Sequence, residues 1–214
     1  SLSKDEQIQI VDQCLEFNYK VLTVPLITNW ENQKEISQKI KNIQIEDLLD
    51  RKPIILDDKS ITKQLKGKTV LITGHTGFKG SWLTAWLEKL GANVVGISKD
   101  IPSTPSHFES LGIQERITHH IFDITDLNSV RDVFHQSKPD FVFHLAAQAI
   151  VSDSLFDPVN TVSSNVLGTT TLLQVLREQE HKIAAVIITS DKCYENEEWV
   201  WGYRENDRMG GKDI

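Results

Sequence analysis

Residues 69–89 read Thr-Val-Leu-Ile-Thr-Gly-His-Thr-Gly-Phe-Lys-Gly-Ser-Trp-Leu-Thr-Ala-Trp-Leu-Glu-Lys. An apolar run is followed by three glycines at a spacing of three and then by a helical pattern. A strand, a glycine turn and a helix in this order form a cradle for phosphate, because glycine allows close backbone approach and the helix start attracts anions. A plain tight turn is the alternative, but this context favours dinucleotide binding.

Each glycine has a separate task in that prediction. Gly74 permits the tight turn, Gly77 lets main-chain amides approach a pyrophosphate, and Gly80 lets the helix pack close to the strand. The intervening residues Thr76, Phe78 and Lys79 complete the predicted cofactor-binding turn.

The rest of the chain alternates strands and helices. Apolar runs predict strands at 69–73, 93–97, 117–122, 141–145 and 184–189, and periodic segments predict helices at 79–90, 126–136 and 159–178. Strands that are apolar on both faces indicate a parallel sheet covered by helices. We therefore predict an α/β fold, a Rossmann-type doubly wound sheet of order 3-2-1-4-5 that is incomplete at its C-terminus. Trp82 and Trp86, one helical turn apart, are expected in the core.

Composition shifts near Gly67 suggest two parts. Residues 1–66 are expected to form a short α/β appendage and linker, and residues 67–214 the nucleotide-binding domain. The ligand crevice is expected at the carboxyl ends of the strands.

Bulk properties exclude several classes of protein. The net charge of −7 and pI of about 5.5 argue against nucleic acid or an anionic membrane as a partner. Two distant cysteines without a C-x-x-C pair favour a reduced, cytoplasmic setting. No apolar run approaches the roughly 18 residues of a membrane span, and we expect no signal peptide. The seven histidines lack metal-ligand spacing, so no metal site is predicted.

An acid follows the second predicted strand. Asp100 lies about 20 residues after Gly80, where a carboxylate accepts hydrogen bonds from ribose hydroxyls and repels a 2′-phosphate, which favours NAD over NADP. The neighbouring Lys99 weakens that preference, and an ordinary surface turn is the alternative.

Two further strand ends carry candidates. Asp123 could accept from the adenine amino group with Ile124 against the ring, although a helix N-cap is the alternative and Asp126 fits that role better. After the fourth strand, the small residues Ala146 and Ala147, with Gln148, let a nucleotide lie near the backbone; close helix packing explains them equally well.

The segment Thr-Ser-Asp-Lys-Cys-Tyr (189–194) leaves the fifth strand at the mouth of the crevice. A hydroxyl, a carboxylate and an amine there suit a proton-transfer reaction, and a polar loop is the alternative.

Residues 74–213 resemble the extended short-chain dehydrogenase/reductase superfamily, and within it the 4,6-dehydratases that act on CDP-glucose. The likeness is carried by Gly-His-Thr-Gly-Phe-Lys-Gly-Ser-Trp-Leu (74–83), Phe-His-Leu-Ala-Ala-Gln (143–148), Asn-Val-Leu-Gly-Thr (165–169), Thr-Ser-Asp-Lys-Cys-Tyr-Glu-Asn (189–196) and Glu-Trp-Val-Trp-Gly-Tyr-Arg-Glu (198–205). Most sugar-nucleotide dehydratases carry Asp-Glu where this chain has Asp191 and Lys192.

The resemblance implies an NAD-dependent loss of water from a nucleotide sugar, CDP-glucose first among them. It implies that Ser190 binds the C4 hydroxyl, Asp191 protonates the departing C6 hydroxyl and Lys192 assists proton removal at C5. It also implies that Leu145, Asn165 and Thr189 help to frame the cofactor.

The departures from the superfamily are as informative. Its Tyr-x-x-x-Lys pair is expected a few residues after Gly210–Asp213, and these 214 residues contain no such pair. We therefore expect a truncated domain, weaker NAD binding and little or no turnover. Residues 1–73 instead resemble membrane-associated polysaccharide-biosynthesis dehydratases, through Val-Leu-Thr-Val-Pro (21–25), Ile-Gln-Ile-Glu-Asp-Leu-Leu (43–49) and residues 65–74.

Two alternatives stay open. One is a related activity, a nucleotide-sugar 4-epimerase or a UDP-sugar dehydratase, which Asp191 and Lys192 disfavour. The other is a non-catalytic nucleotide-binding or interaction module, because an exposed sheet edge after the fifth strand would favour partner binding or a homo-oligomer.

Overall fold

The computed structural model describes residues 4–17, 19, 21–23, 41–42 and 56–210. The chain divides into two compact units, Ser1–Leu56 and Asp57–Ile214. In the first unit, helix α1 (Lys4–Glu16) buries Val11, and strand β1 (Leu22–Thr23) pairs antiparallel with β2 (Lys41–Asn42). The segment 43–49, which carried part of the N-terminal resemblance, lies outside the described residues.

The second unit alternates strands and helices as predicted. Its strands are β3 (Thr69–Thr73), β4 (Asn93–Ser98), β5 (Thr118–Ile121), β6 (Phe141–His144) and β7 (Ala184–Ile187). Its helices are α4 (Asp58–Leu65), α5 (Phe78–Lys89), α6 (His107–Ser110), α7 (Leu127–Ser137), α8 (Val151–Phe156), α9 (Pro158–Val162) and α10 (Gly168–Arg177). Short turns of helix occupy Ile113–Glu115 (η2), Ser163–Leu167 (η3, a π-helix) and Asp191–Cys193 (η4).

The five strands form one parallel sheet in the order β5-β4-β3-β6-β7. Numbered along the chain, this is the predicted order 3-2-1-4-5, so the Rossmann-type fold is confirmed. The reversal of strand order falls between β3 and β6, which is where the crevice of such a sheet opens.

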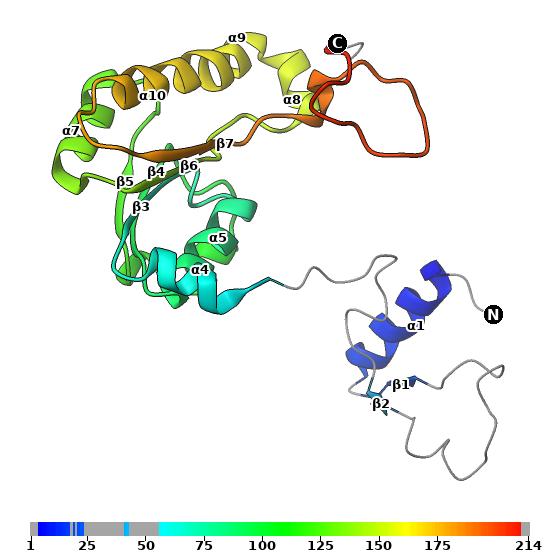
Figure 1. Cartoon of the computed structure of the whole chain (residues 1–214). Coiled ribbons are helices and arrows are strands. Elements are labelled where there is room, and N and C mark those ends of the chain that lie inside the picture. Colours follow the sequence, from blue (N-terminus) through cyan, green and yellow to red (C-terminus); the bar gives the residue numbers. More distant parts are fainter. Residues whose placement is uncertain (1–3, 18, 20, 24–40, 43–55, 211–214) are drawn as a thin grey trace. The chain divides into compact units, whose positions relative to one another are not determined.

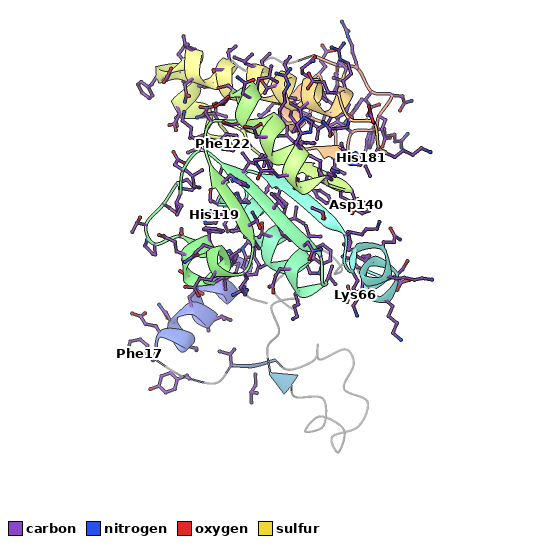
Figure 2. The ribbon with its side chains drawn as sticks, turned by 90° about the vertical axis from the view of Figure 1, so that its left-hand side faces the viewer. Phe17, Lys66, His119, Phe122, Asp140 and His181 are labelled. Atoms are coloured by element: carbon purple, nitrogen blue, oxygen red, sulfur yellow. The ribbon has the colours of Figure 1, made fainter. Side chains whose placement is uncertain are left out.

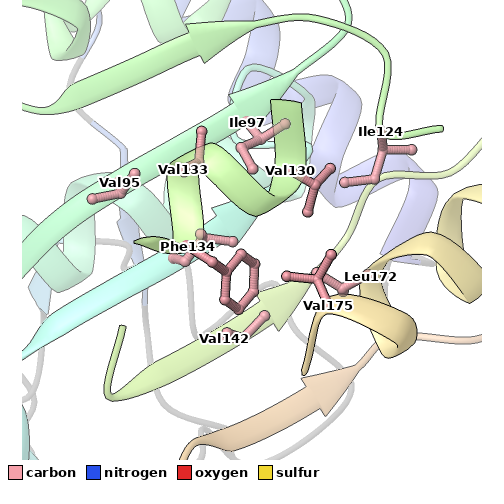
Figure 3. Close-up of a cluster of buried hydrophobic side chains, with 10 residues drawn as sticks. Val95, Ile97, Ile124, Val130, Val133, Phe134, Val142, Leu172 and Val175 are labelled. Carbon is pink, nitrogen blue, oxygen red and sulfur yellow. The ribbon is translucent and has the colours of Figure 1, made fainter. Parts of the chain in front are cut away.

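Alternation along the strands gives each face of the sheet its own core. Leu71, Val95 and Val142 belong to one buried cluster with residues of α7 and α10, whereas Val70 and Ile72 belong to another with residues of α4 and α5. Figure 1 shows these two pairs of helices on opposite sides of the sheet. Figure 3 shows the first of these clusters, in which Phe134, Val130, Leu172 and Val175 from the helices meet the strands; these four side chains are fully buried. The sheet is thus held rigidly from both sides.

The structure places the start of the second unit ten residues earlier than predicted. Helix α4 belongs to it, because Leu65 is buried in the β3–α5 core and Ile61 packs against the same cluster. The charged residues 57–59, predicted as linker, start α4. Asp57 is its N-cap and accepts from the Ser60 amide at 3.1 Å, and Asp58 and Lys59 are its first two residues. That residues 1–56 are the remnant of an upstream domain stays a prediction.

The expectation that Trp82 and Trp86 lie in the core is wrong. Trp82 is 56% exposed and Trp86 39%. The buried residues of α5 are Gly80, Ser81, Thr84 and Leu87, so both indoles lie outside the side of the helix that packs on the sheet.

The two ends of the sheet differ in what they carry. Figure 2 labels Asp140, just before β6, and Phe122, just after β5, at opposite ends of the sheet. At the amino end, Asp140 accepts from the Lys68 Nζ at 2.8 Å and from the Thr69 amide at 3.0 Å. The predicted site residues all lie at the other, carboxyl end.

Candidate functional site

The glycine turn sits between the ends of β3 and β6. Gly74 has φ +75°, a region that favours glycine, and a Cβ there would lie 2.8 Å from the Ala146 nitrogen and 2.9 Å from the Leu145 carbonyl carbon. A Cβ on Gly80 would clash with the Gly74 carbonyl oxygen. Both positions therefore demand glycine for space, which a plain surface turn does not require.

The start of α5 is open to a ligand. Gly77 precedes the helix with an extended backbone, and no side chain caps the first turn. Its leading amides have no partner inside the helix, and the aligned peptide dipoles make this end positive. Phe78 and Lys79 are exposed on that turn. The chain here fits the diphosphate of a dinucleotide.

The end of β4 is tied to the glycine turn. The Thr76 hydroxyl donates to the Asp100 carbonyl at 2.6 Å, and the Thr76 amide donates to the Ser98 Oγ at 3.2 Å. Asp100 is exposed beside the cradle. That the Asp100 carboxylate accepts from the ribose of a bound nucleotide stays a prediction.

A buried histidine supports the same junction. His75 is fully buried, and its Nδ1 lies 2.9 Å from the Ser98 Oγ. The pKa of His75 is lowered to about 4, mainly by burial and to a smaller extent by the nearby His119 and His120, against a backbone hydrogen bond with Ile97 that raises it. His75 is therefore neutral at physiological pH.

The end of β5 carries an ordered carboxylate. Asp123 accepts from the Thr125 amide at 3.0 Å and from its hydroxyl at 2.8 Å, and it pairs with the Lys99 ammonium at 3.2 Å. These hydrogen bonds, first that of the Thr125 amide, lower the pKa of Asp123. The N-cap of α7 is Asp126, the residue that the sequence favoured over Asp123 for that role.

The π-turn η3 joins two other candidates. The Asn165 side chain accepts from the Gln148 amide at 2.7 Å and donates to the Gln148 carbonyl at 3.0 Å. A Cβ on Gly168 would press on the Ile124 side chain, so α10 begins directly against the end of β5. Ala146 is partly buried and Ala147 exposed beside them.

The segment after β7 also reaches this edge. The Ile188 amide donates to the carbonyl of His144, the last residue of β6, at 3.0 Å. Thr189 and Ser190 follow directly after this contact. Lys192 lies in the turn η4, where its backbone amide donates to the Ser190 Oγ at 3.1 Å. Asp191 begins the same turn. That Ser190, Asp191 and Lys192 perform catalysis stays a prediction.

An aromatic loop follows these three residues and returns to them. Tyr194 pairs with Met209, and the Gly210 amide donates to the Cys193 carbonyl at 3.0 Å. Within the loop the Tyr194 and Tyr203 rings stack at 5.3 Å, and Trp199 lies 5.5 Å from Tyr203. The loop ends are therefore fixed beside η4.

Sequence reasoning missed the polar side chains inside the strands. Thr73, Ser98 and His144 are the last residues of the observed strands β3, β4 and β6, are at most 4% exposed, and form hydrogen bonds at the candidate site. Their signal was a polar residue closing an apolar run. Among the described residues, no group of acidic, histidine or cysteine side chains is arranged to hold a metal ion, and no helix is both long and apolar enough to cross a bilayer.

Fold and cradle together define a Rossmann-type domain of the dinucleotide-binding class. Comparison with known proteins gives the family: the sequence model described as GDP-mannose 4,6 dehydratase matches residues 71–209. The chain belongs to this family of nucleotide-sugar dehydratases.

Individual relatives agree with this assignment. The chain is 50% identical over 148 residues to a CDP-glucose 4,6-dehydratase of Salmonella typhimurium, covering 69% of this chain and 41% of that protein. It is 26% identical over 198 residues to the probable polysaccharide biosynthesis protein EpsC of Bacillus subtilis, covering 90% of this chain and 33% of that protein. The chain thus spans less than half the length of these relatives.

A solved structure supports the fold. The UDP-glucose 4-epimerase of Thermus thermophilus, in complex with NAD, superposes with a TM-score of 0.59 at 26% identity, over 68% of this chain and 45% of that one. The likeness extends to the epimerase branch of the superfamily, which was the predicted alternative.

Proposed function

We propose that this chain binds NAD and provides the cofactor-binding part of a nucleotide-sugar 4,6-dehydratase whose substrate is CDP-glucose. The observation that carries the proposal is the cradle at Gly74 and Gly80, where side chains have no room and an uncapped helix start faces the crevice. The likeness to a CDP-glucose 4,6-dehydratase over 69% of the chain supports the substrate.

The chain's own groups divide the work of holding the cofactor. The amides from Gly77 to Gly80 bind the diphosphate, and Asp100 accepts from the ribose hydroxyls. Asp123 and Ile124 lie where the adenine would rest, and Leu145 to Gln148 line the crevice floor. When bound, NAD supplies a hydride acceptor that holds the hydrogen of sugar carbon 4 until carbon 6 receives it.

The residues after β7 perform the proton transfers of the proposed reaction. Ser190 hydrogen-bonds the C4 hydroxyl and Asp191 donates a proton to the C6 hydroxyl, which leaves as water. Lys192 assists removal of the C5 proton, and a lysine must be neutral for that task.

Titration calorimetry with NAD and NADP tests the cofactor. We expect NAD to bind the wild-type chain and to bind tighter than NADP, because Asp100 repels a 2′-phosphate. Absence of binding by a folded sample would contradict the proposal. Residues 1–214 lack a Tyr-x-x-x-Lys pair, so we expect no conversion of CDP-glucose by these residues alone. Detected conversion would overturn that second expectation.

A second function is favoured by one observation. Strand β7 ends the described sheet, and Val186 and Ile188 on or next to it are 49% and 42% exposed. Such a strand favours pairing with another chain, so we also propose a homo-oligomer or interaction module. We place both functions in the cytoplasm, on the acidic composition and the two unpaired cysteines.

A further inference from the structure

Two polar side chains lie inside the apolar layers of the sheet beside the cradle. Thr73 ends β3 and is fully buried, and His144 ends β6 and is 2% exposed. The Thr73 Oγ1 lies 2.6 Å from the His144 Nδ1, and it accepts from the Ala146 amide at 3.1 Å. On its other side the His144 Nε2 lies 2.9 Å from the Thr169 Oγ1 at the start of α10.

The partners of Thr169 give this chain of contacts a direction. The Thr169 hydroxyl donates its single proton to the backbone carbonyl of Asn165 at 2.7 Å. It therefore accepts from His144, whose Nε2 must carry the proton. Burial lowers the pKa of His144, so the ring is neutral and its Nδ1 accepts the proton of the Thr73 hydroxyl. Every donor in the series has one acceptor.

The series ends at Asn165, whose side chain binds the backbone of Gln148 in the floor of the crevice. Asn165 uses its amide group to pair with both backbone groups of Gln148, as a neighbouring strand would. The hydrogen bonds thus run from the Ala146 amide to the backbone carbonyl of Asn165, and the side chain of the same Asn165 holds the backbone of Gln148. Between these two points lies the stretch proposed to face the cofactor.

We propose that His144 is a positioning residue of the dinucleotide site, which holds the Ala146–Gln148 backbone in its binding position through the directed hydrogen-bond relay Thr73–His144–Thr169–Asn165. This inference rests on the proposed NAD binding. It also reassigns Asn165, which was predicted to frame the cofactor, to a role one step removed from it. The relay spans two strands and the π-turn, so it fixes groups that the sheet alone leaves independent.

The relay can be cut at either end without changing side-chain shape. Thr73→Val and Thr169→Val each replace one hydroxyl by a methyl group and leave a His144 nitrogen without its partner; Thr73→Val also removes the acceptor of the Ala146 amide. We expect each substitution to weaken NAD binding about two- to tenfold, the range of one hydrogen bond. Because both hydroxyls act through one imidazole, the double variant should lose less than the product of the two effects.

A matched control exists on the same helix. Thr171 is 6% exposed, two residues beyond Thr169, and takes no part in the relay. We expect Thr171→Val to cost comparable stability and to leave NAD affinity within about twofold. Equal NAD affinity in wild type and in both relay variants would overturn the inference while the proposed function stands. Absence of NAD binding by the folded wild type would overturn both.

Histidine tautomers give a readout that packing alone does not set. With ¹⁵N-labelled histidine, nuclear magnetic resonance should show a protonated Nε2 and an unprotonated Nδ1 for His144, identified as the signals lost in His144→Gln. In Thr169→Val this preference should weaken, whereas Thr171→Val should keep it. A protonated Nδ1 in the wild type would contradict the relay whatever the variants bind.

Discussion

His75 stands directly after the positive-φ glycine, and its ring fills the space that a side chain on Gly96 would need. Its Nδ1 shares the Ser98 hydroxyl with the Thr76 amide. Phe108 meets the ring edge-on at 5.1 Å, with His119 at 5.7 Å. The imidazole thus fills the space between the cradle and β4, and it must stay neutral to do so.

This predicts a loss of stability in mild acid. The folded pKa of His75, about 4, lies below the ordinary value of 6.5, so the unfolded chain binds the proton first as the pH falls. The free energy of unfolding should drop by about 2 kcal/mol between pH 7 and pH 5 from this group. Urea denaturation at both pH values measures it. In His75→Phe this part of the drop should vanish; an unchanged drop would contradict the assignment.

Gly80 gives a second residue-level prediction. Alanine normally stabilises a helix relative to glycine, but here a methyl group would meet the Gly74 carbonyl oxygen. We expect Gly80→Ala to cost about 1–3 kcal/mol of stability and to weaken NAD binding. Gly202 is the control, because a methyl group there would have nothing within 4 Å, and Gly202→Ala should change neither quantity. Thermal unfolding and calorimetry decide between these outcomes.

Lys99 bears on the choice between NAD and NADP. Its ammonium lies 3.2 Å from the Asp123 carboxylate and 3.5 Å from the Asn160 side-chain oxygen, so these two groups hold it in the folded chain. Asp123→Asn should free the Lys99 ammonium to attract a 2′-phosphate. The ratio of NADP affinity to NAD affinity should then rise about two- to fivefold, the scale of an exposed ion pair. The ratio cancels any contact of Asp123 with adenine. In a Lys99→Met background the same substitution should leave the ratio unchanged.

At the scale of elements, apolar runs and glycine spacing predicted every strand of the parallel sheet and its order. They failed on α5, because a helix that is apolar all round does not reveal which side packs. Its buried side consists of Gly80, Ser81, Thr84 and Leu87, while both tryptophans lie outside it. The segment 159–178, predicted as one helix, is divided into α9, the π-helix Ser163–Leu167 and α10, and its apolar periodicity did not indicate that division.

The core on the α7 side yields a stability prediction. Phe134 on α7 is fully buried among the strands and α10, whereas Phe156 on α8 is 88% exposed. Phe134→Ala should lower the free energy of unfolding by about 3–5 kcal/mol through lost burial and a cavity. Phe156→Ala removes the same atoms and should cost less than about 0.5 kcal/mol. Similar unfolding midpoints in urea would contradict the assigned core.

For the whole molecule, the order of the strands leaves β7 at one side of the described sheet, with Val186 and the neighbouring Ile188 exposed. We expect concentration-dependent association, seen by light scattering. A lysine on such a strand opposes pairing, so Val186→Lys should reduce the association. Val200→Lys, at a 96% exposed site in the aromatic loop, should not. Association unaffected by either substitution would place the contact elsewhere.

Sequence reasoning found the site residues that local patterns indicate, namely those of the glycine turn and of the polar segments that follow the strands. The residues it missed act across long separations: Thr73 and His144 are 71 positions apart, and Ser98 and His75 are 23 apart. Such partners meet only once β3, β4 and β6 have aligned. No single segment of the chain announces them.

The close approach of Gly74 to the backbone of Ala146 has a consequence for folding during synthesis. A nascent chain that has left the ribosome only as far as α7 contains the whole glycine turn but lacks the segment after β6 that packs against it. Dinucleotide capture should therefore appear abruptly, when residue 146 emerges, rather than growing with each added element. Cofactor that is present at that stage would stabilise the chains whose sheet has the correct register, because it binds only the folded site.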